Sequence, residues 1–311
     1  MEYRKGETMR YSVVDIGSNT VRMHLYLYEK GKLMDLMHKK KVAGLASYVK
    51  GGYMTNKGIK KLLKILKDYQ NLMEILDIPH NYFFATAAIR NTENARDILE
   101  LVEKQLKIDI DLLSGEEEAA FGYAGIREEY QFDDGIIVDI GGGSTEITIL
   151  EDQKIRYTTS MKEGSLSLKT KFVKGLYPRN KEIKNMEKYI KKLIEKENLP
   201  EISKKMNLYG IGGTIRSCGN ISQEYFDLNS AKKLGPFMVD SLYHELKNKD
   251  KEAMTTVLQV SPERLHTILP GMAILKRILK ETQPKEIYIS KKGIREGYLK
   301  SRIKADEKGK K

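Results

Sequence analysis

Two short loops of the sequence carry residue types that suit phosphate and metal ions. Residues 13–20 read VVDIGSNT and residues 137–145 read IVDIGGGST, so Asp15 and Asp139 are 139 − 15 = 124 residues apart in the same setting. The glycines let the chain turn tightly and approach a ligand, and the exposed N–H groups of such a turn suit phosphate oxygens. Aspartate oxygens suit Mg²⁺. We therefore expect the two loops to face each other across a cleft and to bind a phosphate chain and its metal.

The prediction of phosphate binding depends on the repetition of the loop. A single D-x-G-S loop is more typical of a plain turn, and GGGST alone is typical of a flexible one. Two copies with matched flanks, followed by a third glycine turn, GIGGT at residues 210–214, favour phosphate binding. From the repeat we expect Asp15 and Asp139 to be cleft neighbours serving one metal–phosphate cluster.

Acidic and basic residues that are candidates for catalysis and phosphate binding lie between the two loops in the sequence. Glu116, Glu117 and Glu118 begin a predicted helix, SGEEEAAFGYAGIREEY, where their charges complement the helix dipole. A carboxylate at a cleft edge can also orient and deprotonate a water for attack on phosphorus. Arg22, after the first loop, and Arg90, in ATAAIRN, are either surface cations or bidentate phosphate ligands.

The elements around the loops repeat as well. In each copy the loop is followed by a β-rich run, a polar turn and a second extended run, and helical segments come next. In VRMHLYLY the apolar residues alternate with the others, which is strand periodicity. The sequence predicts an α/β fold with two similar units and mixed sheets. We place the boundary near residues 128–134, which gives domains 1–130 and 131–311, and we leave open that the closing helix packs back on the first domain.

Composition narrows the class of protein. The chain has 311 residues, with 40% hydrophobic and 32% charged, which is typical of a soluble globular protein. Its single cysteine, Cys218, excludes an internal disulfide framework, and its five histidines have no metal-ligand spacing. The sequence has no apolar run of ~18 residues and no signal peptide, so we expect a cytoplasmic protein without a membrane partner. The net charge, 55 − 43 = +12, indicates either a solvated surface or an anionic partner.

The chain resembles the exopolyphosphatase/guanosine pentaphosphate phosphohydrolase (Ppx/GppA) phosphatases in segments that follow the family's order from about residue 11 to 302. These segments are VVDIGSNTVRMHL, ATAAIRNTENA, LLSGEEEAAFGYAGI, GIIVDIGGGSTEI, EGSLSL, GIGGTI and GIREGYL. The resemblance implies two ribonuclease-H-like domains of the actin-like ATPase superfamily, with mixed sheets around a central cleft.

The resemblance also implies roles for individual residues. Glu118, directly before the alanine in SG-x-E-E-A, matches the family's catalytic glutamate, and Glu117 is the alternative if the register differs by one. Asp15, Asp139 and Glu146 match acidic positions implicated in metal binding, with Mg²⁺ or Mn²⁺ as the expected cofactor. The matching phosphate-binding positions are Gly17, Ser18, Asn19, Arg22, Arg90, Gly141, Gly142, Gly143, Ser144, Thr145, Gly212, Gly213 and Thr214.

Two departures limit what the resemblance implies. Many members read S-D-x-G-L-R-E-G near the C-terminus, but Lys291 replaces the aspartate here, so we assign no function to that motif. The chain also lacks the histidine–aspartate signature of longer members, which indicates a short, two-domain member.

We expect an exopolyphosphatase that releases terminal orthophosphate from inorganic polyphosphate. The alternatives are a guanosine pentaphosphate 5′-phosphohydrolase of the stringent response and a non-catalytic alarmone or nucleotide binder. An ATP-dependent kinase or actin-like ATPase is disfavoured, no nucleic acid polymer is expected, and a homodimer is left open.

Overall fold

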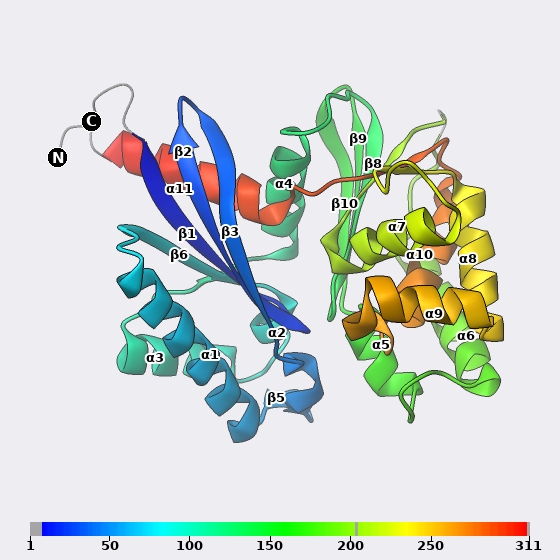
Figure 1. Ribbon diagram of the computed structural model, residues 1–311, viewed down its shortest axis with the longest axis horizontal. Coiled ribbons are helices and arrows are strands. Elements are labelled where there is room, and N and C mark those ends of the chain that lie inside the picture. The colour runs from blue at the N-terminus through cyan, green and yellow to red at the C-terminus, as the bar shows by residue number, and fades with distance from the viewer. Residues whose placement is uncertain (1–7, 203–204, 310–311) are drawn as a thin grey trace. The chain divides into compact units, whose positions relative to one another are not determined.

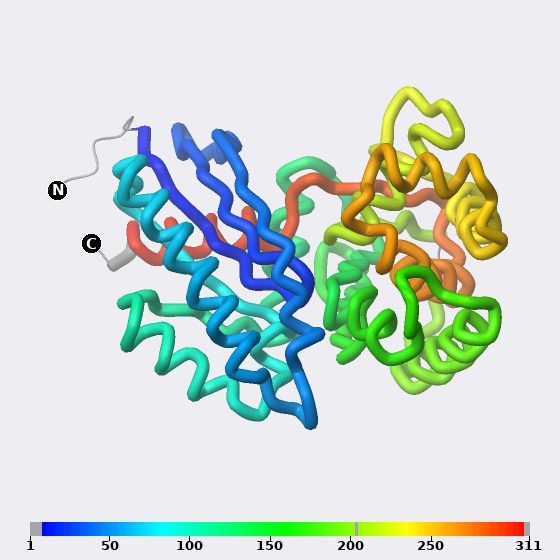
Figure 2. The backbone as a smooth tube through the Cα atoms, turned by 60° about the horizontal axis from the view of Figure 1, so that its bottom comes forward, coloured from blue at the N-terminus to red at the C-terminus, as the bar shows by residue number. Residues whose placement is uncertain are grey.

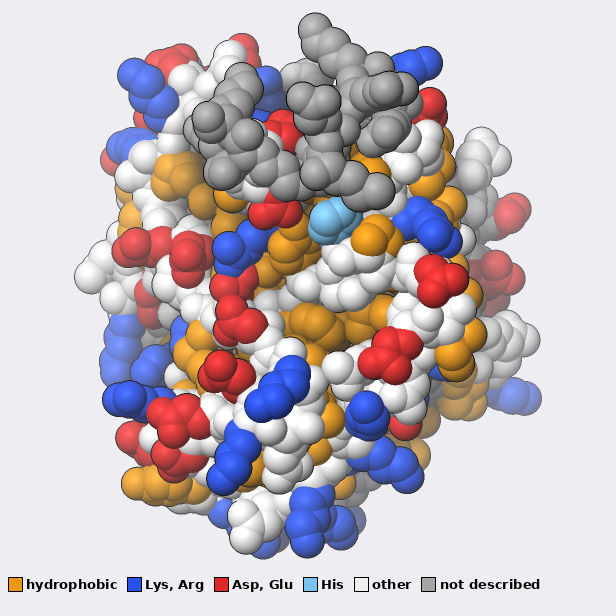
Figure 3. Space-filling model, turned by 90° about the vertical axis from the view of Figure 1, so that its left-hand side faces the viewer, with side chains coloured by type: hydrophobic (Ala, Val, Ile, Leu, Met, Phe, Trp, Pro, Cys, Tyr) orange, Lys and Arg blue, Asp and Glu red, His pale blue; other side chains and the backbone are white. Residues whose placement is uncertain are grey.

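The computed structural model describes residues 8–202 and 205–309. Its contacts divide the chain into two compact units, residues 1–114 with 298–311, and residues 115–297. Among the described residues, no helix combines the length and apolar character that crossing a membrane requires. On the face in Figure 3, Lys and Arg side chains are intermixed with Asp and Glu, and hydrophobic side chains are exposed between them. The excess positive charge is therefore not gathered on that face.

The first unit is built around a five-stranded sheet (Figure 1). Its order is β3-β2-β1-β6-β7, in which β1, β2 and β3 are antiparallel while β1, β6 and β7 are parallel. Its elements are β1 (Met9–Ile16), β2 (Thr20–Glu29), β3 (Lys32–Val42), η1 (Leu45–Tyr48), β4 (Val49–Lys50), β5 (Tyr53–Met54), α1 (Asn56–Ile75), β6 (His80–Ala85), α2 (Ala87–Arg90), α3 (Ala95–Leu106) and β7 (Asp111–Leu112).

The core of this unit lies between the sheet and the helices α1 and α3. The alternation predicted for β2 places Val21 and Met23 on the face that packs with these helices. Tyr69 of α1 is buried there, with its hydroxyl 3.0 Å from the carbonyl oxygen of Val21 and 3.1 Å from that of Lys39. Burial raises the pKa of Tyr69 to about 12, so the hydroxyl stays a donor at neutral pH.

The C-terminal helix α11 (Ile294–Gly309) lies along the strands of the first unit from Tyr298 onward (Figure 2). The rings of Tyr298 and Phe84 are 4.8 Å apart between centroids, and the Tyr298 hydroxyl donates to Asp111. Arg302 pairs with the same Asp111 carboxylate. Helix α11 thus packs on a sheet whose strands all precede residue 114.

The second unit has a six-stranded sheet in the order β10-β9-β8-β11-β13-β12. Its elements are α4 (Gly115–Ile126), β8 (Gly135–Ile140), β9 (Thr145–Glu151), β10 (Lys154–Met161), α5 (Ser165–Phe172), α6 (Asn180–Lys196), β11 (Leu208–Ile211), α7 (Gly212–Tyr225), β12 (Lys233–Leu234), α8 (Pro236–Asn248), α9 (Lys251–Val260), η2 (Pro262–Arg264), α10 (Ile268–Thr282) and β13 (Ile287–Ile289).

The two sheets have the same topology. In the second, β10, β9 and β8 are antiparallel and β8, β11 and β13 are parallel, as β3, β2, β1, β6 and β7 are in the first. Strand β12 is an antiparallel addition at the edge. The α/β class and the duplicated mixed sheets predicted from the sequence are therefore confirmed, and the shared strand order is the ribonuclease-H-like one.

The division of the chain lies earlier than residues 130 and 131. Helix α4 contacts β8, β9 and β10, so it belongs to the second unit, and the first unit ends at residue 114. The sequence placed the boundary in the polar stretch after α4, just before the second copy of the repeat. The packing of α4 on the strands that follow it leaves no comparable mark in the sequence.

Helix α4 is also held by a close backbone approach. A Cβ at Gly125 would overlap the carbonyl oxygen of Gly293, and one at Gly297 would overlap that of Phe121. The helix can lie against the 293–297 segment only because glycine stands at these positions. This packing fixes the helix that carries Glu118.

Gly125→Ala should lower the free energy of unfolding by about 1–3 kcal/mol, because the added methyl group displaces backbone atoms. Alanine is normally favoured over glycine inside a helix by about 0.5–1 kcal/mol, so the sign is informative. Urea unfolding followed by circular dichroism measures the change. The matched control is Gly122→Ala on the same helix, where the new Cβ would meet the flexible Cδ1 of Ile211 at 3.1 Å. We expect that control to stay within about 1 kcal/mol of the wild type, and equal losses in both variants would contradict the role of Gly125.

Candidate active site

The two glycine loops have the same geometry in their own units. In the first, Asp15 of β1 pairs with Arg22 of β2, and the N–H of Gly17 donates to the Thr20 carbonyl at 3.1 Å. In the second, Asp139 of β8 pairs with Glu146 of β9, and the N–H of Gly141 donates to the Ser144 carbonyl at 3.0 Å. The offset of 124 therefore holds residue by residue through both loops, so position 22 corresponds to position 146.

The second loop rests on the N-terminus of α5. The N–H of Ser165 donates to the carbonyl oxygen of Gly141 at 3.0 Å, and those of Leu166 and Ser167 donate to that of Gly142 at 2.9 Å. These bonds use donors that a helix start leaves without intrahelical partners. A trans peptide directs its N–H opposite to its C=O. The N–H groups of Gly142 and Gly143 therefore point away from α5, and neither donates to a backbone carbonyl in the described part of the chain.

The first loop is held in a comparable way by the segment after β3. The carbonyl oxygen of Asn19 accepts from the N–H groups of Ala43 and Gly44, both at 2.8 Å, and that of Ser18 accepts from Ala46 at 3.1 Å. The same peptide geometry turns the N–H groups of Asn19 and Thr20 outward. Each loop thus presents consecutive N–H groups, which is an arrangement that binds anions.

The third glycine turn lies beside the second loop. Strand β11 ends next to β8, with Ile211 paired to Asp139, and Gly212 follows with a φ of 84°. A Cβ on Gly212 would overlap Oδ1 of Asp139, so glycine makes room for this carboxylate. Thr214, in the first turn of α7, is buried, and its hydroxyl oxygen has no hydrogen-bond partner among the described residues.

A row of polar residues crosses the second sheet at this level. Ser160 of β10, Glu146 of β9 and Asp139 of β8 are successive register partners, and the Ser160 hydroxyl donates to Oε1 of Glu146 at 2.9 Å. Glu146 is 4% exposed, while Asp139 is half-buried. The row therefore places two carboxylates on neighbouring strands, one of them oriented by a hydroxyl.

Helix α4 begins beside this row. A Cβ on Gly115 would stand 2.5 Å from the Cβ of Ser160, so the helix start touches β10. Glu118 lies three residues later, on the same side of the helix. It is 4% exposed, whereas Glu117 is exposed. Of these two glutamates, only Glu118 is on the buried side of α4.

The remaining candidates lie in the first unit. The guanidinium of Arg90 donates to the carbonyl oxygen of Leu113 at 2.7 Å, which places it where β6 and β7 end. Arg22 is half-buried. Asn19 is 4% exposed, and its amide nitrogen lacks a hydrogen-bond partner within the described part of the chain. A buried donor without a partner costs about 1–3 kcal/mol, and a phosphate oxygen is one group that would satisfy it.

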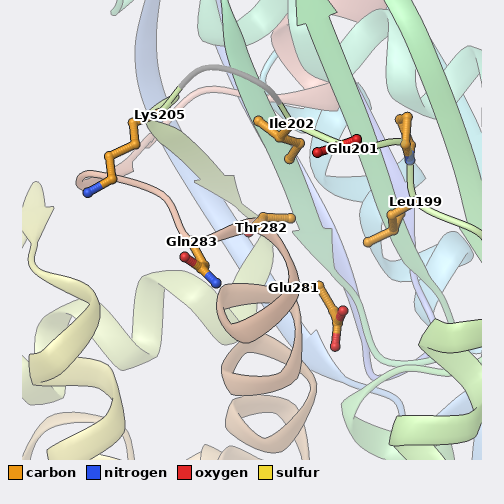
Figure 4. A pocket seen from close by; sticks show the side chains of 8 residues that line it. Leu199, Glu201, Ile202, Lys205, Glu281, Thr282 and Gln283 are labelled. Carbon is orange, nitrogen blue, oxygen red and sulfur yellow. The ribbon is translucent and has the colours of Figure 1, made fainter.

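Within each unit, the candidates gather at the carboxyl ends of the parallel strands, where ligands of open α/β sheets bind. Two pockets lie elsewhere. One of about 330 Å³ is lined by residues 199–202, 205 and 281–283, just before β11 and β13 begin (Figure 4). Another, of about 380 Å³, includes Asn81 at the start of β6. Both are therefore at the opposite ends of the strands from the glycine loops.

The donor set within the second unit fits a magnesium ion. Over residues 8–202 and 205–309, no group of three or more His, Cys, Asp or Glu side chains is arranged to hold a metal. Mg²⁺ needs fewer, because it is bound through one or two carboxylates plus water and substrate phosphates. Asp139 and Glu146 are the two carboxylates that would serve here. Asp15 lies in the other unit, and its distance from Asp139 stays a prediction.

Two residues of this region had not been singled out from the sequence. Ser160 orients Glu146 from a strand whose sequence, KIRYTTSM, carries no distinguishing signal. Glu163 holds the start of α5, and the segment EGSLSL marks its place without indicating what its carboxylate contacts. Both act through strand register or helix packing, which a motif does not encode.

The chain is similar to proteins of one phosphatase family. Residues 27–305 match the model of the Ppx/GppA phosphatase family. A bifunctional 3-dehydroquinate synthase/phosphatase of Fusobacterium nucleatum is 31% identical over 296 residues, which is 88% of this chain and 44% of that protein. Exopolyphosphatase 1 of Mycobacterium tuberculosis is 29% identical over 161 residues, or 50% of this chain and 47% of that protein. The match spans less than half of either relative.

Solved structures extend the likeness over nearly the whole chain. The Aquifex aeolicus member of the Ppx/GppA family is 26% identical, with a TM-score of 0.76 over 96% of this chain and 99% of that one. An exopolyphosphatase from Cytophaga hutchinsonii is 20% identical, with a TM-score of 0.81 over 96% and 98% of the two chains, and shows the same fold.

Gly212→Ala should destabilise the protein by more than a positive φ alone explains. A non-glycine residue in such a conformation costs about 1–3 kcal/mol, and the new Cβ would also displace the Asp139 carboxylate. Urea unfolding measures the total. The control is Gly31→Ala, where φ is 80° and no atom lies within 4 Å of the new Cβ. If both substitutions lower the free energy of unfolding by the same amount, the close contact between Asp139 and position 212 is contradicted.

Proposed function

Because this chain belongs to the Ppx/GppA phosphatase family, we propose that it releases terminal orthophosphate from inorganic polyphosphate. The observation that carries the proposal is that each glycine loop, within its own unit, has carbonyl oxygens held by a neighbouring segment, so the N–H groups of the same peptides point away from that segment. A polyphosphate end offers several anionic oxygens, which such N–H groups would bind.

We assign the two loops different charges and hence different tasks. The position after the first loop holds Arg22 beside Asp15, while the equivalent position after the second holds Glu146 beside Asp139. The second loop would therefore hold Mg²⁺ or Mn²⁺ through Asp139 and Glu146, with Asp15 as a further ligand. When bound, the metal neutralises charge on the phosphoryl oxygens. Arg22 and Arg90 would bind phosphate oxygens directly.

Glu118 is the residue we assign to the attacking water. Hydrolysis of a phosphoanhydride needs a water aligned with the leaving oxygen and a group that orients it and accepts its proton. Glu118 lies on the side of α4 that touches β10, the strand whose Ser160 hydrogen bonds to Glu146. Glu117 is exposed and stands apart from that side.

Phosphate release from short polyphosphate, long polyphosphate and guanosine pentaphosphate tests the proposal. We expect release from polyphosphate, loss of all activity in excess EDTA, and restoration by Mg²⁺ or Mn²⁺. Activity on the polymer should also fall as salt rises, because the attraction between unlike charges is screened. Preference for guanosine pentaphosphate would establish the alternative substrate, and full activity in EDTA would exclude the metal.

Glu118→Gln should lower kcat by about 10²–10⁴-fold, because glutamine keeps the size of the side chain and loses its basicity. Affinity for polyphosphate should change little or improve, since a negative charge is removed. Steady-state kinetics and calorimetric binding separate the two effects. Glu117→Gln is the matched control and should have a far smaller effect. Loss of turnover in the control alone would move the role to Glu117, and wild-type turnover in both would leave Glu146 as the next candidate.

A further inference from the structure

Glu163 is a buried carboxylate that the proposed chemistry does not use. It follows β10 and immediately precedes the start of α5, and it is 8% exposed. Its Oε2 accepts from the Ser167 hydroxyl at 2.6 Å. Its Oε1 accepts from Lys171 at 2.9 Å and from the Tyr189 hydroxyl of α6 at 2.7 Å. Both oxygens of the carboxylate are therefore occupied by donors from two helices.

The backbone at Glu163 joins this cluster to the second glycine loop. The Thr145 hydroxyl, at the end of the loop, donates to the Glu163 carbonyl at 2.8 Å. Next in the chain, Gly164 lies so close to the loop that a Cβ would stand 2.6 Å from the carbonyl oxygen of Gly141. The N–H groups that follow hold the carbonyls of Gly141 and Gly142. The side chain of Glu163 thus fixes the segment on which the loop rests.

Lys171 remains a cation in this cluster. Burial alone would lower the pKa of Lys171. Its hydrogen bonds to Tyr189 and Glu163 raise the pKa by more than burial lowers it, so the pKa lies above the usual value for lysine. The ammonium nitrogen also lies 3.9 Å from the centroid of the Tyr189 ring. A charged donor and a hydroxyl on one carboxylate oxygen make a strong, directional attachment.

We propose that Glu163 is a positioning residue for phosphate binding, and this inference rests on the proposed function. It holds the N-terminus of α5 against the loop, and α5 keeps the loop carbonyls turned inward and the N–H groups of Gly142 and Gly143 turned outward. Because a phosphate held by these N–H groups is bound before and during the reaction, weakening them removes ground-state and transition-state binding equally. Such a loss raises KM and leaves kcat nearly unchanged.

The chain contains a matched control for this cluster. Glu187 of α6 accepts from the Tyr243 hydroxyl and from Lys247, both at 2.8 Å on Oε1. The donors are again one tyrosine and one lysine, and they lie on α8. This cluster ties α6 to α8, whereas the loop rests on α5. Its loss should destabilise the protein without turning the loop peptides.

The experiment compares Glu163→Gln with Glu187→Gln in the full chain. We measure KM and kcat for phosphate release from short polyphosphate, calorimetric affinity for inorganic triphosphate, and the midpoint of thermal unfolding. Glu163→Gln should raise KM and weaken triphosphate binding about tenfold, with kcat within about threefold of the wild type. Glu187→Gln should leave KM, kcat and triphosphate affinity within about twofold of the wild type, although both variants should unfold at a lower temperature. Wild-type KM in Glu163→Gln, or equal changes in both variants, would overturn the inference.

Hydrogen exchange separates this inference from the proposed function. The amides of Ser165, Leu166 and Ser167 are hydrogen bonded to the loop, so they should exchange faster in Glu163→Gln than in Glu187→Gln. This readout needs no substrate and decides the positioning role even if the wild type releases no phosphate, a result that would exclude the proposed function alone. Unchanged exchange in Glu163→Gln overturns the inference. Should Glu163→Gln not fold, Tyr189→Phe against Tyr243→Phe makes the same comparison with one hydrogen bond removed from each cluster.

Discussion

The planarity of the peptide bond governs what the glycine loops can do. Once the carbonyl oxygens of Gly141 and Gly142 are held by the first turn of α5, the N–H groups of the same peptides must point the other way. Binding capacity for an anion therefore depends on what lies behind the loop. Glycine permits the close approach, but the helix start, the neighbouring strand and the Glu163 cluster determine the direction. Exposed side-chain cations would add attraction without this directionality.

The repeat contains two such loops, and the residue at one equivalent position gives them different charges. Positions 22 and 146 are equivalent in strand register, yet one is arginine and the other glutamate. Beside its aspartate, Arg22 gives the first loop a balanced pair, whereas Glu146 gives the second two neighbouring negative charges. Neighbouring carboxylates repel each other, so the cation that we propose for the second loop would stabilise this pair. Two loops of similar sequence therefore differ in charge, and this difference is the reason we propose metal binding for one and phosphate binding for the other.

The repeat made the fold predictable, because matched loops with matched flanks require matched strand order. The residues at the loops followed from the same observation. Contacts between distant segments did not: nothing in KIRYTTSM distinguishes Ser160, and nothing before α4 assigns that helix to the second sheet. The alternation in β2 indicated one buried face, yet His24 on the other face is also buried and stacks with Tyr26 and His38. Periodicity indicates on which face of the sheet a side chain lies, but it does not indicate whether other residues cover that face.

The C-terminal motif, in which lysine replaces the expected aspartate, forms a turn that is held by other residues. Lys291 departs from the aspartate expected from the family resemblance, yet the turn around it is well held. The carboxylate of Glu129 accepts from the Ser290 hydroxyl at 2.6 Å and from the N–H of Lys291 at 2.7 Å and of Lys292 at 3.1 Å. Burial alone would raise the pKa of Glu129. These hydrogen bonds lower the pKa by more than burial raises it, so the carboxylate is charged at neutral pH. The next residue, Gly293, is the one that α4 packs against. A carboxylate outside the motif therefore fixes the turn that supports the helix of Glu118, and it does so through the backbone N–H of Lys291 rather than through its side chain.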